Sequence, residues 1–231
     1  MKLLAIDTSS IACSAAVRNG ADRYLRHEEQ PREHTRLLVP MIHELLGESG
    51  LTLGELDAIV LGNGPGSFIG MRIAASVAQG LAYASSLQIV PVSSMAAVAA
   101  RVLAEDDVNE VVVAQDAHMQ QVYLGIYTAD ENGLPVDRLP ERLHDLVAIE
   151  DLDAENVGNR MAAGFGWQRY PELLVANRDR VTRVAEVLHP NAEDLLDLGR
   201  AALDAGAGLE PQDIMPAYLR QKVAEKPNRA P

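Results

Sequence analysis

The 231-residue chain is poor in the residues on which several protein classes depend. Cys13 is its single cysteine, which excludes a scaffold stapled by disulfides. No run of about 18 apolar residues occurs, so a membrane-spanning helix is not expected. Of the 20 basic residues only Lys2, Lys222 and Lys226 are lysines. The formal charge of the sequence is −13, and it contains no cluster of basic residues. Proteins that grip RNA or DNA cluster Lys and Arg, so this chain alone is a poor candidate for that role.

The sequence does contain enough apolar material for a folded core. Hydrophobic residues make up 48% of it, which is near the globular average and excludes an intrinsically disordered chain. The length suits one large domain or two small ones. The N-terminus reaches a charge too early for a signal peptide, so we expect a cytoplasmic location. We interpret the excess of acidic residues as a source of solubility.

Hydrophobic periodicity predicts two halves of similar plan. In each half, a strand ends in an acid, Asp7 or Asp116, and a turn leads into a second strand. The first half continues with helices at 33–47 and 71–84 on either side of a buried strand at 57–61. The repeated opening indicates a duplicated α/β architecture with lobes at 1–106 and 107–231. The second lobe is the smaller one, and its helix at 193–205 is expected to pack back on the first lobe.

A glycine-rich loop at 62–70 leads into the helix at 71–84. Such a loop can bind phosphate through backbone N–H groups, but neither a Walker loop nor the dinucleotide fingerprint fits its spacing. Spacing alone favours a tight turn that brings the helix close to the sheet. The paired acids leave two alternatives evenly open, a metal–phosphate site and backbone-bonding Asx turns. The candidate residues of a phosphate-loop remnant are Asp7, Thr8, Ser9, Gly64, Gly66, Ser67, Arg72 and Asp116.

Residues suited to metal or nucleophilic chemistry do not occur at the spacings that this chemistry needs. No two of the six histidines lie three or four residues apart, and Gly47 stands where a zincin helix beginning at His43 needs its second histidine. Ser67 lacks the sequence of a nucleophile elbow. Cys13 is expected to be a buried hydrophobe. We therefore predict no metal site and no catalytic residue in this chain.

The helices at 33–47 and 71–84 each carry an apolar arc of about 200°, whereas packing on a sheet needs only about 100°. Contact between the two helices accounts for part of the excess, and a partner protein is favoured for the rest. Ala74, Ala78 and Ala82 form a ridge of small residues that would let another helix approach closely. The predicted partner-binding residues are Leu37, Leu38, Met41, Ile42, Leu45, Met71, Ala74, Ala75, Ala78 and Ala82.

Four segments together resemble the TsaB (YeaZ) family. They are Ile6-Asp7-Thr8-Ser9, the stretch from Gly64 to Ile73, the stretch from Gln115 to Tyr123, and Pro216-Ala217-Tyr218-Leu219-Arg220. The resemblance covers nearly the whole chain and is firmest over residues 1–127. Ile69 stands where the family usually has Thr, and His118 stands where it usually has Arg.

The resemblance implies a two-lobed α/β fold of the actin/Hsp70/sugar-kinase-like (ASKHA) class, each lobe a mixed sheet with flanking helices. It implies a non-catalytic subunit needed to make threonylcarbamoyladenosine beside the anticodon of certain tRNAs. In that family TsaB pairs with TsaD through a bundle of the first two helices of each protein, and the ATPase TsaE joins them. ATP and a metal ion are then expected in the partner subunits, none bound by this chain alone, and tRNA contact is indirect. Whether the isolated chain is a monomer or a homodimer stays open.

Two other functions remain as alternatives. An ATP-dependent small-molecule kinase of the same fold would use Asp7, Asp116 and the turn at 8–10. Against it, the second half has no obvious glycine-glycine loop for adenosine, and Gly164-Phe165-Gly166 is the nearest candidate. A metallopeptidase is the third hypothesis, and the sequence offers no site for it.

Overall fold

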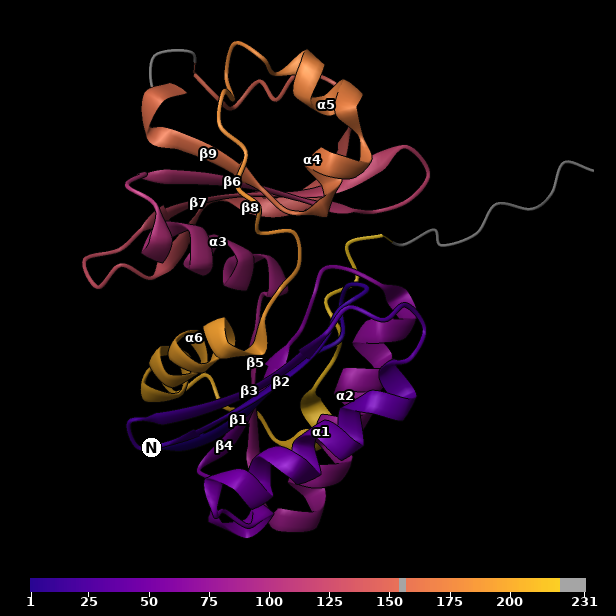
Figure 1. The fold of residues 1–231 in the computed structure, drawn as a ribbon, viewed down its shortest axis with the longest axis vertical. Coiled ribbons are helices and arrows are strands. Elements are labelled where there is room, and N and C mark those ends of the chain that lie inside the picture. The colour runs from indigo at the N-terminus through magenta and orange to yellow at the C-terminus, as the bar shows by residue number, and fades with distance from the viewer. Residues whose placement is uncertain (154–156, 221–231) are drawn as a thin grey trace, which may run out of the picture.

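The computed structural model describes residues 1–153 and 157–220, which form two lobes that each contain one mixed sheet (Figure 1). The first sheet has the order β3-β2-β1-β4-β5 and the second the order β8-β7-β6-β9. The strands of the first sheet are β1 (Lys2–Asp7), β2 (Cys13–Asn19), β3 (Asp22–Glu28), β4 (Ala58–Gly62) and β5 (Gln88–Val92). Those of the second are β6 (Glu110–Asp116), β7 (Gln121–Ala129), β8 (Pro135–Asp145) and β9 (Arg160–Ala163).

The two sheets are built on the same plan. Each begins with an antiparallel meander, β1-β2-β3 or β6-β7-β8, and then a later strand pairs in parallel with the first strand of the meander. In the first lobe β5 adds a further parallel strand beside β4. The duplicated α/β architecture predicted from the two strand–acid–turn units is therefore confirmed, and with it the two-lobed fold class.

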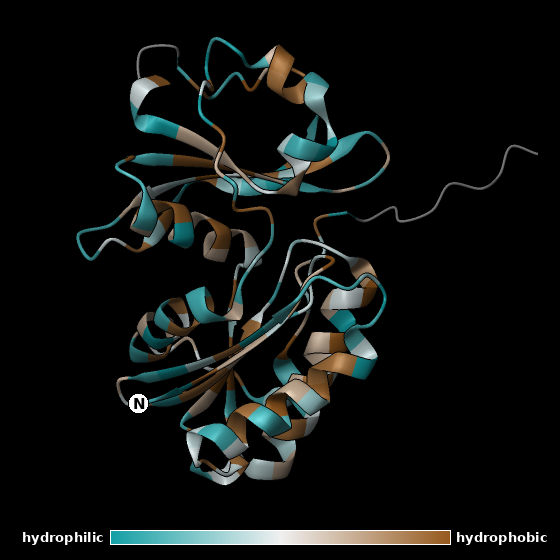
Figure 2. Ribbon diagram, in the orientation of Figure 1, coloured by the Kyte–Doolittle hydropathy of each residue, from teal (hydrophilic) through white to brown (hydrophobic). Residues whose placement is uncertain are grey.

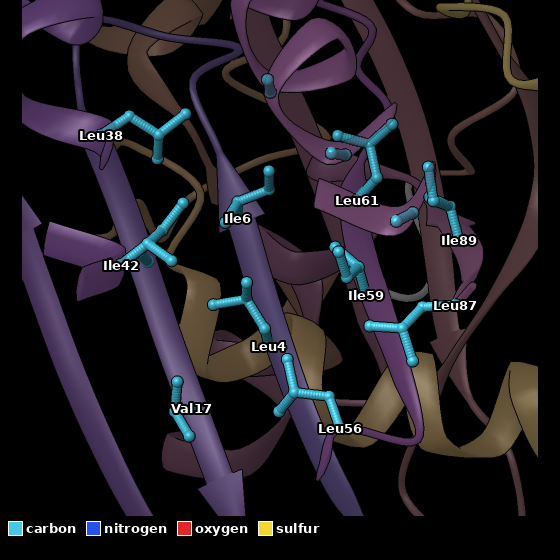
Figure 3. Packing of buried hydrophobic residues seen from close by; sticks show 14 of the residues in the cluster. Leu4, Ile6, Val17, Leu38, Ile42, Leu56, Ile59, Leu61, Leu87 and Ile89 are labelled. Atoms are coloured by element: carbon cyan, nitrogen blue, oxygen red, sulfur yellow. The ribbon is translucent and has the colours of Figure 1, made fainter. Parts of the chain in front are cut away.

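Helices cover both faces of the first sheet. The long helices α1 (His34–Ser49) and α2 (Phe68–Ser85) lie on one face, and α6 (Ala192–Asp204) lies on the other (Figure 1). On the α1–α2 face, Leu38 and Ile42 point toward side chains of β1 and β2 such as Ile6 (Figure 3). The short helices α4 (Phe165–Arg169) and α5 (Pro171–Ala176) cover the outer face of the second sheet. Short 3-10 turns lie at η1 (Leu53–Glu55), η2 (Val157–Asn159) and η3 (Pro211–Asp213).

Helix α3 (Ser94–Glu105) lies between the two sheets, and its largest cluster of contacts is with the second one. Met95, Val98 and Val102 pack with the core of β6, whereas Ala97 faces α6 and the first sheet. The chain thus leaves the first sheet before α3, not after residue 106 as the sequence analysis placed the boundary. The acids at 105–107 mark the end of a helix that already belongs with the second sheet. The end of the predicted second lobe, 221–231, lies outside the described residues.

The crossing between the lobes is fixed by a side-chain network at the start of α3. The hydroxyl of Ser93 accepts hydrogen bonds from the backbone N–H groups of Met95 (3.1 Å) and Ala96 (3.0 Å) and so caps the helix. The same hydroxyl donates to the carboxylate of Glu141 on β8, as does the Tyr127 hydroxyl on β7. Burial raises the pKa of Glu141, while these two donors oppose that rise. The helix cap is thereby tied directly to the second sheet.

Within residues 1–153 and 157–220, no helix is both long and apolar enough to cross a bilayer.

The fully buried Arg160 anchors the start of β9 to β6. Its guanidinium donates to the carboxylate of Glu110, and its Nη1 donates to the backbone carbonyls of Asp153 (2.8 Å) and Arg180 (2.9 Å). Arg138 on β8 also pairs with Glu110, at 2.7 Å. One buried arginine thus joins two strands and two loops of the second lobe.

We expect Arg160→Ala to lower the free energy of unfolding by about 3 kcal/mol, because Glu110 keeps a buried charge with only one of its two partners. The exposed Arg178 provides the control, since Arg178→Ala should change stability by less than about 0.5 kcal/mol. Urea unfolding followed by circular dichroism measures both. Equal stability of the two variants would show that the buried pair does not support the second lobe.

Candidate functional site

The turn that follows β1 is buried, and its polar groups are satisfied from within the fold. The Asp7 carboxylate accepts hydrogen bonds from the Ser9 backbone N–H (2.7 Å), the Ser9 hydroxyl (2.8 Å) and the Ser94 hydroxyl of α3 (2.5 Å). Asp7 is 1% exposed, and this burial raises its pKa against the opposing effect of the donors. The Thr8 hydroxyl donates to the Gly70 carbonyl at 2.6 Å. The first of the paired acids is therefore an Asx-type structural group.

The glycine-rich loop packs directly on this turn. A Cβ atom at Gly70 would lie 1.8 Å from the Thr8 carbonyl oxygen, and one at Gly66 would lie 2.2 Å from the Ser9 carbonyl oxygen. The Ser9 carbonyl also accepts the Ser67 N–H at 2.6 Å. Ser67 caps α2 by accepting the Gly70 N–H at 3.2 Å. The glycines are needed for close approach of backbone to backbone, which is the tight-turn interpretation that the spacing favoured.

A cleft of about 710 Å³ separates the two lobes in front of this loop. Its first-lobe wall includes Ser9, Ser10, Gly66, Ser67 and Gly70, and its second-lobe wall includes Gln115, Asp116, His118, Phe165 and His189.

All of the eight proposed phosphate-loop residues except Arg72 and Asp116 lie together where the glycine loop packs on the turn after β1. Four of them line the cleft: Ser9, Gly66, Ser67 and Asp116. Asp7, Thr8 and Gly64 are buried, and Arg72 lies on the outer side of α2.

Asp116, the second of the paired acids, faces the cleft. Its Oδ1 accepts hydrogen bonds from the Tyr170 hydroxyl and the His118 backbone N–H, both at 2.8 Å, and its Oδ2 lies 3.3 Å from the His118 Nδ1. The side chain is 17% exposed. Burial, and then the adjacent Asp116 carboxylate, raise the pKa of Tyr170 to about 12. Tyr170 is not among the residues predicted from the sequence, because it lies in a region with weak hydrophobic periodicity.

The structure corrects the predicted partner ridge. Ala74, Ala78 and Ala82 are 0% exposed and face the first sheet, so they form internal core and not a surface. Of the other predicted partner residues, Leu38, Met41, Ile42, Leu45, Met71 and Ala75 are also buried, and Leu37 is half-buried at the margin of the core. Small side chains here allow α2 to lie close to the strands. The apolar arcs of both helices are wide, but the part of the arc that was assigned to the partner packs on the first sheet.

The outward faces of α1 and α2 carry a second apolar surface, which we call the outer groove. It is a hollow of about 410 Å³ between the helices, lined by His34, Thr35, Leu38, Val39, Phe68, Ile69, Arg72, Ile73, Ser76 and Val77. Val39 is 53% and Ile69 is 69% exposed. Figure 2 shows hydrophobic residues along both helices. Val39 belongs to the apolar arc predicted for the helix at 33–47, but the width of that arc does not distinguish the residues that face the sheet from those that face outward.

The described residues contain no group of three or more His, Cys, Asp or Glu side chains placed to hold a metal ion. The buried Asp7 carboxylate already accepts three hydrogen bonds, and Cys13 is buried in β2, where burial raises its pKa to about 12.

These features define a two-lobed α/β protein with one mixed sheet in each lobe, a cleft between the lobes and an apolar groove on the first lobe. Residues 28–156 match the family model described as "TsaD: tRNA N6-adenosine threonylcarbamoyltransferase". The protein called tRNA threonylcarbamoyladenosine biosynthesis protein TsaB in Escherichia coli K12 is 35% identical over 98% of this chain and 97% of its own length. The protein of that name in Haemophilus influenzae is 31% identical over 98% and 96%.

Solved structures agree with these matches. A Pseudomonas aeruginosa protein described as similar to peptidase YeaZ superposes with a TM-score of 0.87 at 38% identity, over 95% of this chain and 99% of the other. A structure described as YeaZ from the same organism gives a TM-score of 0.84 at 35% identity, over 94% and 99%. The chain belongs to the TsaB (YeaZ) family, which confirms the resemblance found in its sequence motifs.

We expect Gly70→Ala to lower the free energy of unfolding by about 2–3 kcal/mol, because the new methyl group overlaps the Thr8 carbonyl. A Cβ atom at Gly80 in the same helix would meet no neighbouring atom within 4 Å, so Gly80→Ala should stabilise by about 0.5–1 kcal/mol. Thermal unfolding of both variants measures the difference. A neutral Gly70→Ala would refute the packing role of the loop.

We expect Ala78→Glu to unfold the isolated chain, because a carboxylate in this core has no partner and costs about 4 kcal/mol or more. Ser76→Glu, on the exposed side of the same helix, should leave the fold intact. Near-ultraviolet circular dichroism and gel filtration distinguish the two. A folded Ala78→Glu monomer would contradict the assignment of this ridge to the core.

Proposed function

We propose that this chain is a subunit without chemistry of its own that supports transfer of a threonylcarbamoyl group to the adenosine beside the anticodon of tRNAs. It acts by pairing with a TsaD-like transferase and by recruiting the ATPase TsaE. The names of its relatives support the pathway. The observation that carries the subunit role is the outer groove, an exposed apolar surface on two long neighbouring helices.

The chemistry of the outer groove fits a protein partner. Val39, Ile69 and Phe68 expose apolar side chains along its walls, and Arg72 stacks over the Phe68 ring with 3.3 Å between the guanidinium carbon and the ring centroid. Apolar surface with aromatic and arginine residues at its margin is typical of protein interfaces. The surface that we propose for the partner is thus the outward face of α1 and α2, in place of the buried alanine ridge.

The likeness between this chain and the TsaD family model supports a TsaD-like protein as the partner. The TsaD family model matches residues 28–156, which include both helices of the outer groove. Two proteins that share this unit can pair through corresponding helices about a pseudo-twofold axis. Such pairing buries the same kind of apolar surface on each side. ATP and the metal ion then belong to the partner subunits, and tRNA is held mainly by them, in keeping with three lysines and a charge of −13 in this chain.

We expect Val39→Glu to weaken binding to the TsaD-like partner by about 100-fold, because a carboxylate is buried in an apolar contact. The isolated variant should stay folded, since Val39 is 53% exposed. Val136→Glu on β8, where the valine is 45% exposed, is the matched control outside the groove. Isothermal titration with the partner measures affinity, and tRNA modification by the reconstituted proteins measures activity. Equal affinity of the two variants would place the interface elsewhere.

An ATP-dependent kinase of the same fold is the second candidate, and one observation favours it. The lining of the cleft of about 710 Å³ is mainly apolar, but polar groups of both lobes, Asp116 among them, also face it. Titration of the isolated chain with Mg-ATP separates the candidates. Micromolar binding with turnover, abolished in Asp116→Asn, would support the kinase and contradict the subunit role. Retained modification activity of Asp116→Asn in the assembled complex supports the subunit role.

A further inference from the structure

The C-terminal part of the described chain crosses from the first lobe to the second. It begins at η3 beside α2, where the Gln79 side chain donates to the Pro211 carbonyl at 2.9 Å, and Ile214 is buried in the core of the first lobe. From there the segment rises past α2 toward the second lobe (Figure 1). Leu219 packs against the core cluster of the second lobe. We call residues 214–220 the strap.

The middle of the strap rests on the loop before α2 and on its first turn. The Asn63 side chain donates to the Met215 carbonyl at 3.1 Å, and the Ala217 N–H donates to the Asn63 carbonyl at 3.2 Å. The Tyr218 ring lies 5.7 Å from the Phe68 ring, centroid to centroid. The Arg72 guanidinium carbon is 4.9 Å from the Tyr218 centroid. The strap therefore touches the same Phe68 and Arg72 that border the outer groove.

The far end of the strap is fastened by Arg220 to the hairpin between β6 and β7. Its guanidinium donates to the Gln121 side-chain oxygen (2.7 Å) and to the His118 carbonyl (3.3 Å), and contacts the Met119 sulfur at 3.4 Å. His118, Met119 and Gln120 all have left-handed backbones, with φ of 59°, 53° and 60°. Three consecutive non-glycine residues in this region are costly and persist only where contacts hold them.

The contacts of the Arg220 guanidinium leave part of its hydrogen-bonding capacity unused, which favours release of the strap from the hairpin. Among the described residues, the Nε of Arg220 is buried without a hydrogen-bond partner, and the atoms that the guanidinium contacts are neutral, so no ion pair locks it there. Met215 is 74% and Tyr218 is 37% exposed. Few buried contacts and a strained partner are the marks of a segment that opens locally before the lobes unfold.

We propose that the strap is a releasable latch that sets the separation of the two lobes, with Arg220 as its fastening residue. When Arg220 is engaged, the strained hairpin holds His118 and Asp116 in the wall of the cleft. When it is released, the hairpin relaxes, the cleft widens, and Tyr218 leaves Phe68 and Arg72. One segment thereby couples the width of the cleft to the surface beside the outer groove.

Hydrogen exchange measured by mass spectrometry tests the latch on the full chain. We expect Arg220→Ala to speed exchange in 116–121 and 211–219 by about tenfold, the loss expected for one charge-assisted hydrogen bond, with the sheet cores unchanged. Arg200→Ala, an exposed arginine on α6, is the control and should change neither segment. Arg220→Lys keeps the charge but loses the planar fork, so it should fall between the two. Unchanged exchange in Arg220→Ala would overturn the proposal.

A distance measurement tests the consequence for the lobes. Spin labels at His43→Cys on α1 and Glu172→Cys on α5, with the buried Cys13 replaced by Ser, report the separation of the lobes by electron-electron double resonance. The Arg220→Ala background should broaden the distance distribution and shift it to longer values, whereas Arg200→Ala should not. An unchanged distribution, or faster exchange spread through both sheet cores, would show that the strap is ordinary core packing and would overturn the latch.

A substitution that relieves the backbone strain in the hairpin should slow hydrogen exchange in the strap, the opposite of the effect expected for Arg220→Ala. Gln120 is exposed, its side chain makes no hydrogen bond within the part of the chain that the structure describes, and Asn adopts the left-handed region more readily than Gln. Gln120→Asn should therefore slow exchange in 216–220 by stabilising the latched hairpin. Exchange equal to that of the unmodified chain would refute the role of strain in release.

Discussion

The buried carboxylate of Asp7 is the interaction on which the rest of the arrangement depends. It gathers donors from its own turn and from Ser94, the first residue of α3, while the Ser94 hydroxyl accepts the Gly64 N–H at 3.0 Å. One ionisable group thus fixes the end of β1, the start of the glycine loop and the start of the helix that carries the chain into the second lobe. A carboxylate with such burial is tolerated because three donors point at it. The same burial keeps Asp7 out of the lining of the cleft.

The sequence predicted the elements where hydrophobic periodicity is strong. The first meander, the first two strands of the second meander, the long helices and the returning helix at 193–205 were found from spacing and turn residues, because each element must bury one face. The region 135–190 resisted prediction for a physical reason. Its elements α4 and α5 are only five and six residues long, and its core is completed by contacts from distant strands, such as the Trp167 indole N–H bonded to the Val112 carbonyl at 3.0 Å. Short segments stabilised by tertiary contacts carry little local signal.

The partner ridge illustrates a different limit. A helical wheel gives the width of an apolar face, but it does not reveal which part of that face meets the sheet. Ala74, Ala78 and Ala82 looked like a site for close approach of a foreign helix, and the close approach is real, but it is made by the first sheet of the same chain. The larger exposed residues Val39 and Ile69 remain outside. Small residues on a helix indicate that another backbone packs closely against it, but they do not indicate whether that backbone belongs to the same chain.

The two halves show how a duplicated unit can diverge while keeping its packing rules. In the first lobe, glycines after β4 seat the loop on the turn of Asp7; in the second, Gly164 and Gly166 after β9 would place Cβ atoms 2.4 and 2.8 Å from the Ala114 carbonyl oxygen. The glycine pair that resembled an adenosine loop therefore seats α4 against β6. The two acids differ in their exposure to the cleft. Asp7 is buried and accepts hydrogen bonds from serines, whereas Asp116 lines the cleft, accepts a hydrogen bond from Tyr170 and precedes a strained hairpin. The outer groove lies on the lobe whose acid is buried and hydrogen-bonded, and the cleft-facing acid lies on the other lobe.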